Sequence, residues 1–303
     1  MNKILHRQSS MRLISIPGVF LLIWVIGCSS KQERLIDCAG PVKLVEGFGF
    51  AEGPVADTEG NLYFTDIPAC KIYKWSAKSN LELIADSTGN GNGLSMDQQG
   101  NLIVCEMGRR RISMVTREGG YINITDSYQG KMYNRPNDVW VHPRGGIYFT
   151  DPAYFLSPEE KEQDIEAVYY IDPSRTTVRR VSDHLTRPNG IVGTRDGSAL
   201  YVVSDTIHKT WKFRISKDGT LAQKQLFIEN GHDGLTLDKK GNLYIANRDS
   251  LSVDIYNSKG HYLERIYFPE PPSNVCFGGA QKNILYATAE TSVYAVKMRV
   301  SGQ

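Results

Sequence analysis

A short unit that combines a turn with the start of a strand recurs six times along this chain of 303 residues. The copies occupy residues 57–63, 97–103, 142–148, 195–201, 238–244 and 279–286, and their starts lie 40 to 53 residues apart. Repeats with a period of about 40–50 residues and short strands are typical of β-propellers, in which each repeat forms one blade of four strands. The repeat therefore predicts an all-β propeller.

Strand counting predicts how the ring closes. Each of the first five repeats supplies two more strand-like runs after the shared unit, such as residues 71–75 and 81–85 in the first and 253–256 and 262–268 in the fifth. The sixth repeat has only residues 292–298 before the chain ends. We expect residues 42–46 to supply its missing outer strand, because closing the ring removes an exposed edge that would promote aggregation. The prediction is a six-bladed β-propeller of four-stranded antiparallel blades, closed by an N-terminal strand.

One oxygen-bearing side chain stands before each turn, in the order Glu52, Asn92, Asn137, Asn189, Asp233 and Asn274. Small or apolar residues two and four positions later give the period of a strand, so these side chains are expected to enter the innermost strands around one mouth of the channel. Asn and Asp are also common turn formers, which is the alternative for any single position. Six such residues at equivalent positions favour the convergence of their side chains on the channel axis. Carboxylate and amide oxygens without His or Cys favour a hard cation, calcium above all, with zinc or magnesium as alternatives.

The N-terminus has the pattern of an export signal. Residues 1–27 combine a basic start with an apolar run that ends in Val25-Ile26-Gly27-Cys28, which resembles the lipobox of bacterial lipoproteins. We expect residues 1–27 to be a signal peptide, 28–40 a tether and 41–303 the propeller. Lipidated Cys28 would hold an exported, periplasm-facing lipoprotein at a membrane of the cell envelope. An ordinary signal peptide or an uncleaved anchor are the alternatives, and Met11 is an alternative start.

Charge and cysteines restrict the partners. The leader carries three basic and no acidic residues, so its removal turns the net charge of +2 into −1 and leaves no support for a nucleic-acid partner. The remaining cysteines, Cys38, Cys70, Cys105 and Cys276, match no CxxC or zinc pattern. Cys105 and Cys276 lie in strand-like runs and are expected to be buried free thiols. We expect a monomer.

Several motifs together resemble the SMP-30/gluconolactonase/LRE-like family of six-bladed propellers across nearly all of the mature chain. They are Glu52-Gly53-Pro54, Asn134-Arg135-Pro136-Asn137-Asp138, Phe149-Thr150-Asp151-Pro152, Arg187-Pro188-Asn189-Gly190, and Asp233-Gly234 followed by Asp238. The resemblance implies a lactone hydrolase with one calcium or zinc ion at the channel mouth. By resemblance Glu52, Asn189 and Asp233 would ligate the ion, and Asn137 would be a fourth ligand or a substrate contact. Arg135 would touch substrate oxygens, with Asn92 as a further substrate contact.

Two departures from the family pattern concern the pocket wall. The family often has Trp two residues after its Glu-Gly-Pro, where this chain has Ala56, and often His-Gly where this chain has Met107-Gly108. These changes affect substrate identity more than metal binding. Some members of the family hydrolyse phosphorus–fluorine bonds or other esters, which are further substrate classes for this chain.

The predicted reaction is metal-assisted opening of a sugar-type lactone, with the cation polarising the carbonyl. Asp233 is the candidate base for the attacking water, and His232 beside it is the alternative. Residues 153–166 form the longest break in the blade pattern and are either a lid, with Tyr154 and Phe155 shaping the pocket, or a solvated loop with a short helical turn. A different class of function also fits: a non-catalytic, membrane-tethered binding propeller whose calcium is structural.

Overall fold

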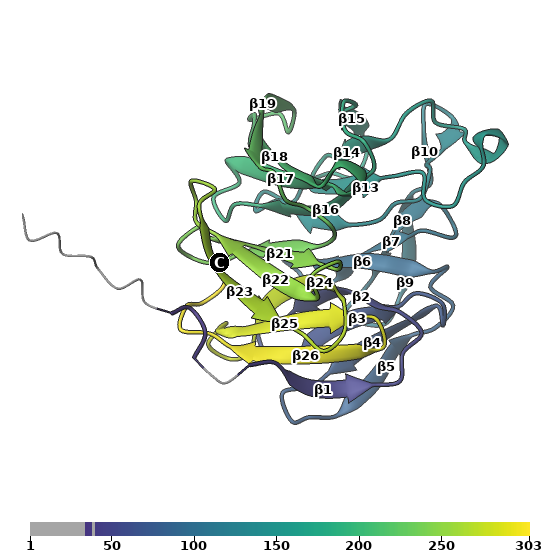
Figure 1. The fold of residues 1–303 in the computed structure, drawn as a ribbon. Helices are drawn as coiled ribbons and strands as arrows, with labels where there is room; N and C mark the ends of the chain where they lie inside the picture. Colours follow the sequence, from purple (N-terminus) through teal and green to yellow (C-terminus); the bar gives the residue numbers. More distant parts are fainter. Residues whose placement is uncertain (1–33, 38–39) are drawn as a thin grey trace, which may run out of the picture. The chain divides into compact units, whose positions relative to one another are not determined.

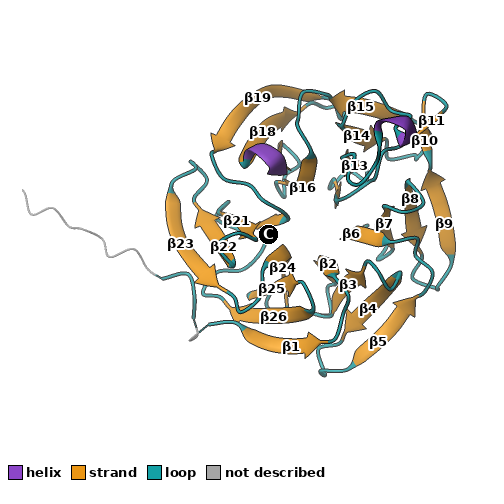
Figure 2. Cartoon of the chain, turned by 45° about the vertical axis from the view of Figure 1, so that its right-hand side comes forward, coloured by secondary structure: helices purple, strands orange, loops and turns teal. Residues whose placement is uncertain are grey.

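A computed structural model describes residues 34–37 and 40–303, and these residues form an all-β ring. Six four-stranded sheets are arranged around a common axis (Figures 1 and 2). The predicted signal peptide, Cys28, Met11 and Cys38 lie outside the described residues. The six sheets around one axis confirm the expectation of a six-bladed β-propeller.

Each sheet runs from an inner strand at the axis to an outer strand at the rim. The first three blades are β2 (Ala51–Ala56), β3 (Leu62–Asp66), β4 (Lys71–Trp75) and β5 (Leu81–Ala85); β6 (Gly91–Met96), β7 (Leu102–Glu106), β8 (Arg111–Val115) and β9 (Tyr121–Thr125); and β12 (Val139–Val141), β13 (Ile147–Asp151), β14 (Ala167–Ile171) and β15 (Val178–Ser182). The next two are β16 (Pro188–Gly193), β17 (Ala199–Ser204), β18 (Lys209–Ile215) and β19 (Leu221–Ile228); and β20 (Leu235–Leu237), β21 (Leu243–Asn247), β22 (Ser252–Tyr256) and β23 (Tyr262–Tyr267).

The sixth blade combines both ends of the chain. It consists of β24 (Pro272–Gly278), β25 (Ile284–Ala289), β26 (Ser292–Lys297) and, as its outer strand, β1 (Val42–Glu46). β1 pairs antiparallel with β26, with Val42 opposite Ala295, and the Lys43 ammonium lies 3.1 Å from Glu270 Oε1. The predicted closure by residues 42–46 is confirmed.

In three of its six copies, the repeated turn is held by its own aspartate. In the first copy Asp57 Oδ1 accepts hydrogen bonds from the backbone N–H of Glu59 (2.9 Å) and Asn61 (2.8 Å), and Asn61 Nδ2 donates to Asp57 Oδ2 (2.7 Å). Asp97 and Asp238 make the same three bonds in their turns. The aspartate thus accepts hydrogen bonds from backbone N–H groups that have no partner in the hairpin. This role explains why the motif recurs with turn-forming residues at fixed positions.

The hydrophobic core is divided among the blade interfaces. Six clusters of buried apolar residues occur in the described part of the chain, and each draws on two neighbouring blades. Phe64 and Tyr286, for example, join the first blade to the sixth. The inner strands also contact one another around the whole ring, from β2 and β6 round to β24 and β2. Apolar packing therefore holds the blades together and leaves the axis to polar groups.

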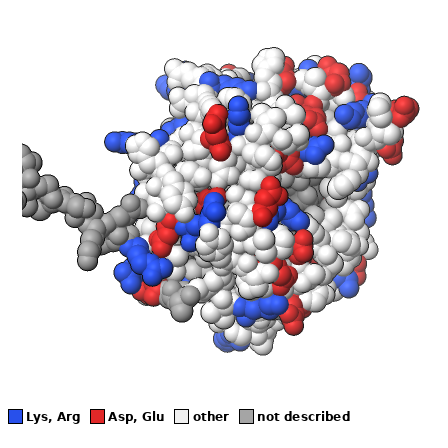
Figure 3. All heavy atoms as spheres, viewed as in Figure 1, with Lys and Arg blue, Asp and Glu red and all other residues white. Residues whose placement is uncertain are grey.

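Few elements lie outside the blades. They are the hairpin β10 (Ser127–Tyr128) and β11 (Lys131–Met132) and the 3₁₀ helices η1 (Pro158–Glu160) and η2 (Asp205–Ile207). Within residues 34–37 and 40–303, no helix has the length and apolar character to cross a bilayer. The face in Figure 3 intersperses acidic and basic side chains.

The cysteines that the structure describes are free. Cys105 is fully buried, whereas Cys276 and Cys70 are partly exposed. The expectation of a buried free thiol is confirmed for Cys105, whereas Cys276 is free as expected but only partly buried. Burial raises the pKa of both thiols above the usual range, so both stay protonated and unreactive at neutral pH.

Candidate active site

The residues that lead each inner strand meet at one end of the ring. Glu52, Asn92 and Asn189 are the second residues of β2, β6 and β16, while Asn137 and Asp233 stand two residues before β12 and β20. All five are buried and line one cavity of about 470 Å³. The volume is typical of a small-molecule site. The convergence expected from the repeat is present for these five.

Neighbouring blades fix the backbone of these leading residues. Thr65 of β3 donates its hydroxyl to the carbonyl oxygen of Asn92 in the next blade (2.9 Å), and Thr150 of β13 does the same to Asn189 (2.7 Å). The glycines that follow the leading residues permit this close approach. A Cβ at Gly53 would lie 2.3 Å from the carbonyl oxygen of Asn92. The Glu-Gly and Asn-Gly pairs therefore reflect tight contact between inner strands.

Two carboxylates in the cavity repel each other. Burial raises the pKa of Asp233 well above its ordinary value, and the charge of Glu52 raises it further. Burial also raises the pKa of Glu52, with the nearby Asp138 as the next cause. Each group is thus held where its charged form is unfavourable without a positive partner. The side-chain amides beside the pair offer oxygen atoms that can coordinate a cation, and one of them, Asn189, forms a hydrogen bond with Asp233. Two carboxylates and several amide oxygens fit a hard divalent cation.

Two further polar residues lie close to Glu52. Asn274, the sixth leading residue, donates from Nδ2 to Glu52 Oε2 (3.1 Å) and is not among the residues that line the cavity. Asp138 accepts hydrogen bonds from the backbone N–H of Val139 (2.9 Å) and Ile191 (3.1 Å), and burial raises its pKa to about 6. Asn274 thus orients a proposed ligand rather than joining the cavity wall. Asp138 ties the third blade to the fourth.

Arg248 is the cation of the cavity, and the sequence patterns did not single it out. Its Nη1 lies 3.8 Å from Asp233 Oδ2, its Nη2 lies 3.3 Å from Glu290 Oε1, and its guanidinium stacks over the ring of Phe50 at 5.0 Å. The charge of Arg248 offsets part of the pKa increase of Asp233. Nη1 is buried with no hydrogen-bond partner within the described chain, so a substrate oxygen is a fitting acceptor for it.

A positional signal for Arg248 exists in the repeat. Ile67, Met107, Asp205 and Arg248 each follow the last residue of the second strand of their blade, and all four line the cavity. These four wall residues therefore occupy one equivalent position in four blades, just as the leading residues occupy an equivalent position in their blades. The expected change of pocket wall at Met107 is consistent with this placement.

The long loop of the third blade reaches the cavity. Tyr154 and Phe155 both line it; Tyr154 is partly buried, whereas the side chain of Phe155 is 84% exposed. The hydroxyl of Tyr154 donates to Asp205 Oδ2 and accepts from Asn189 Nδ2 (2.9 Å). Both earlier alternatives hold in part, since Tyr154 and Phe155 shape the pocket and the same loop contains η1 as a short helical turn.

The remaining predicted residues differ in position. His232 lines the cavity beside Asp233. Arg135 does not belong to the residues that line it. The backbone N–H of Arg135 donates to the carbonyl oxygen of Pro152 (3.0 Å), which holds it toward the loop after β13. Its proposed contact with substrate stays a prediction, and the arginine that does line the cavity is Arg248.

Comparison with known proteins agrees with this geometry. The model of the SMP-30/gluconolactonase/LRE-like region matches residues 50–291, which is most of the chain. The chain belongs to this family. The match begins two residues before Glu52 and covers every leading residue that lines the cavity.

Relatives within the family are named as lactonases. A gluconolactonase of Zymomonas mobilis is 26% identical over 90% of this chain and 86% of its own length, and a lactonase drp35 of Staphylococcus epidermidis is 26% identical over 72% and 69%. The solved structure of a gluconolactonase from Xanthomonas campestris superposes with a TM-score of 0.79 at 26% identity, covering 87% and 91%. A calcium-binding regucalcin from Agrobacterium tumefaciens shares the fold, with a TM-score of 0.75 at 17% identity, covering 88% and 95%.

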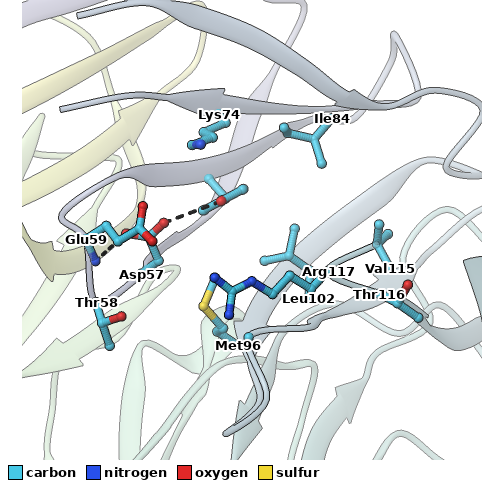
Figure 4. Close-up of a pocket in the computed structure, with 12 residues that line it drawn as sticks. Asp57, Thr58, Glu59, Lys74, Ile84, Met96, Leu102, Val115, Thr116 and Arg117 are labelled. Atoms are coloured by element: carbon cyan, nitrogen blue, oxygen red, sulfur yellow. Dashed lines mark hydrogen bonds between the residues drawn. The ribbon is translucent and has the colours of Figure 1, made fainter. Parts of the chain in front are cut away.

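A second hollow of about 340 Å³ lies between the first two blades, at the opposite ends of the inner strands (Figure 4). Its acidic group Asp57 is already bound to the backbone N–H groups of its turn, and Lys74 lies 3.8 Å from Glu82. These groups have structural partners. The cavity at the other mouth instead holds two buried carboxylates, Glu52 and Asp233, whose charges repel each other, and it is the candidate active site.

Proposed function

We propose that this chain is a metal-dependent lactone hydrolase that opens sugar-type lactones in the cavity of Glu52 and Asp233. The observation that carries the proposal is the pair of buried, mutually repelling carboxylates among amide oxygens. Its support from relatives is that several are named gluconolactonase or lactonase.

Glu52, Asn189 and Asp233 would hold the cation, with Asn137 as a fourth ligand or a substrate contact. Calcium suits this oxygen set, and zinc or magnesium are the alternatives. When bound, the divalent ion would polarise the lactone carbonyl and stabilise the charge that develops on its oxygen. The regucalcin that shares the fold is itself named a calcium-binding protein, which agrees with this choice.

Substrate would be oriented by the polar wall. Arg248 Nη1 and the amide of Asn92 are placed to bind the ring oxygens of a sugar lactone, and the apolar groups of Phe50, Ile67 and Met107 would face its carbon skeleton. Such alternation of polar and apolar contacts suits a polyhydroxylated ring. A sugar-type lactone is therefore the favoured class over other esters or organophosphates, whose groups make less use of these donors.

Two groups compete for the role of general base. Asp233 would contact both the ion and the attacking water; a bound cation lowers the pKa of a carboxylate, so its advantage as a base is its position rather than its basicity. His232 has a pKa lowered by burial and then by His208, so it is neutral near pH 7 and can accept a proton. Asp233 is the proposed base because the Arg248 guanidinium and Asn189 orient it toward the same space as the substrate.

The test is a panel of sugar lactones assayed with the parent, Asp233→Asn and His232→Gln, with calcium binding measured alongside. We expect the parent to lose activity in EDTA and regain it with calcium, and Asp233→Asn to lose at least about 100-fold in kcat. Asp183→Asn, a change of an exposed carboxylate remote from the cavity, is the matched control. Full turnover by Asp233→Asn with calcium bound would remove Asp233 from the chemistry.

The main alternative is a non-catalytic binding propeller with a structural ion. It predicts no turnover of any lactone or ester by the parent, together with saturable binding of a sugar or protein at the same mouth. The buried Nη1 of Arg248 suits a bound sugar oxygen in either case, so turnover of a lactone by the parent is what separates the two functions.

We further propose that Cys28 tethers the propeller to a membrane of the bacterial envelope after export. The pattern of residues 25–28 supports it. Labelling of cells with a radioactive fatty acid should mark the parent and leave Cys28→Ala unmarked. Equal labelling of both proteins would exclude the lipid anchor.

A further inference from the structure

Three metal-ligating side chains gather at the rim of the cavity from two blades. His208 directly follows η2, the helix beside β18 in Figure 2; His232 precedes Asp233; and Asp249 lies in the turn between β21 and β22. One ligand atom from each lies within 4.8 Å of the others. His232 Nδ1 is 3.5 Å from Asp249 Oδ2, and the two imidazole rings are 4.2 Å apart between centroids.

The donor set differs in kind from that of the cavity. The ligands proposed for the cavity ion, Glu52, Asn189 and Asp233, offer oxygen atoms, whereas this cluster offers two imidazole nitrogens and one carboxylate oxygen. Imidazole suits zinc and other late transition ions, and it is a poor ligand for calcium. Three protein ligands with a remaining position open to solvent is the arrangement of many zinc sites that hold water or a substrate group.

A simple ion pair explains the cluster less well. The Asp249 side chain is 76% exposed, and an exposed pair with His232 would contribute little stability. Such a pair also gives no reason for His208. This residue adopts a left-handed backbone conformation (φ 50°) at the end of η2, and its ring lies against that of His232. A common ligand accounts for all three residues.

We propose that His208, His232 and Asp249 form a second metal site, specific for a zinc-type ion. Ligand atoms around a tetrahedral zinc ion are about 3.3–3.6 Å apart, so the present separations must close by roughly 1 Å. His208 and Asp249 are exposed, and rotation of their side chains supplies that movement. The site goes beyond the proposed lactone hydrolysis and does not depend on it.

The position of the site links it to the cavity. His232 belongs to both, and the backbone N–H of His208 donates to the carbonyl oxygen of Asp205 (3.1 Å) at the start of η2. Asp205 in turn accepts the hydroxyl of Tyr154. An ion at the rim would therefore hold η2 and, through Asp205, the wall residue Tyr154.

The experiment uses the full-length chain without a histidine tag, kept in saturating calcium so that the oxygen-lined cavity is occupied. Zinc is titrated by calorimetry, and bound zinc and calcium are then counted by elemental analysis. We expect one zinc per chain with no loss of calcium. His208→Ala and Asp249→Asn should each weaken zinc binding by at least about tenfold. His184→Ala, a change of an exposed histidine beside Asp183, is the control and should bind zinc as the parent does.

Cobalt titration gives an independent readout. The parent should develop the visible absorption of a four-coordinate cobalt ion, and Asp249→Asn should lose most of its intensity. Asp249 is exposed, so this variant keeps the fold even where His208→Ala does not, and its melting temperature provides the check. Absence of stoichiometric zinc binding by the parent, unchanged affinity in both variants, or zinc uptake at the expense of calcium would each overturn the second site.

Discussion

The two carboxylates of the cavity allow one substitution to change stability in opposite directions. Asp233→Asn keeps the shape of the side chain and removes one charge. In the metal-free protein, burial and the charge of Glu52 both disfavour ionised Asp233. The variant should therefore be more stable than the parent in EDTA. In calcium the order should reverse, because the variant has lost a ligand.

The magnitude follows from simple electrostatics. Two unit charges about 5–8 Å apart, with an effective dielectric constant of about 20, repel by roughly 2–3 kcal/mol. On the same scale, loss of the attraction between Asp233 and Arg248, which are 3.8 Å apart, offsets this repulsion fully, so the gain comes from relief of the burial cost, the largest cause of the raised pKa of Asp233. We expect a net gain of about 1–2 kcal/mol for the metal-free variant, or about 3–6 °C in Tm. Calcium at 100 times its Kd should stabilise the parent by about 2.7 kcal/mol and the variant by much less.

The assay is thermal unfolding of the parent, Asp233→Asn and Asp183→Asn at pH 8, each in EDTA and in calcium. The control should resemble the parent in both conditions. If Asp233→Asn melts below the parent in EDTA by as much as in calcium, the carboxylates do not repel each other and the shared ion site is refuted.

The same pair predicts how stability depends on pH. Folding raises the pKa values of Glu52 and Asp233, mainly through burial. At a pH above the ordinary carboxyl pKa, the folded protein therefore still binds protons that the unfolded chain has released. The free energy of unfolding of the metal-free parent should therefore fall as the pH rises from about 4 through the raised pKa values. Calcium should largely remove this decline, and a decline of equal slope with calcium would contradict the assignment.

Three further predictions concern ring closure, inner-strand packing and the loop. Burial opposes ionisation of Glu270, but hydroxyl groups of the last blade and Lys43 hold its pKa at about 2, below the ordinary 4.5. Glu270→Gln should therefore lower the free energy of unfolding at pH 7 by about 1–2 kcal/mol after solvent screening. Urea titrations should show this difference shrinking as the pH falls from 4.5 to 2. A Cβ at Gly234 would lie 1.9 Å from a side chain of the neighbouring inner strand. Gly234→Ala should therefore lower the free energy of unfolding by about 2 kcal/mol or more and weaken calcium binding in calorimetry. A normal calcium affinity would contradict the tight contact. Tyr154→Phe removes the hydroxyl bound to Asn189 and should reduce kcat/KM for lactones by about tenfold with little change in Tm, and equal kinetics would show that the loop does not support the site.

The sequence was sufficient for the fold because local and global signals agree. The predicted strands 42–46, 71–75 and 81–85 have the observed bounds, since short runs of strand-forming residues between turns determine them locally. Elsewhere the bounds shift by one residue, as in β22, which begins at Ser252, and β26, which ends at Lys297. The short inner strands β12 and β20 begin two residues after Asn137 and Asp233. The carbonyl oxygen of Asn137 accepts from Gly93 of the neighbouring blade (2.8 Å), while its N–H donates to Thr150 of its own blade (2.9 Å).

The site was predictable only where a residue type repeats in register. The leading residues share chemistry as well as position, so the repeat reveals them. The wall residues Ile67, Met107, Asp205 and Arg248 share a position after the second strand and no chemistry, so residue type does not reveal them and only the position in the repeat links them. Contacts between blades, such as Asn274 with Glu52, depend on the curvature of the closed ring and lie beyond any local signal.

The division between apolar interfaces and a polar axis explains why this ring can hold charges that repel. Six apolar clusters join the blades away from the axis, so the frame does not depend on the residues at its centre. The frame can therefore keep Glu52 and Asp233 buried beside each other even though their ionised forms destabilise the protein. Because the donors are held in place before binding, little reorganisation is needed when a cation and a substrate oxygen arrive, which is the electrostatic preorganisation on which such catalysis depends.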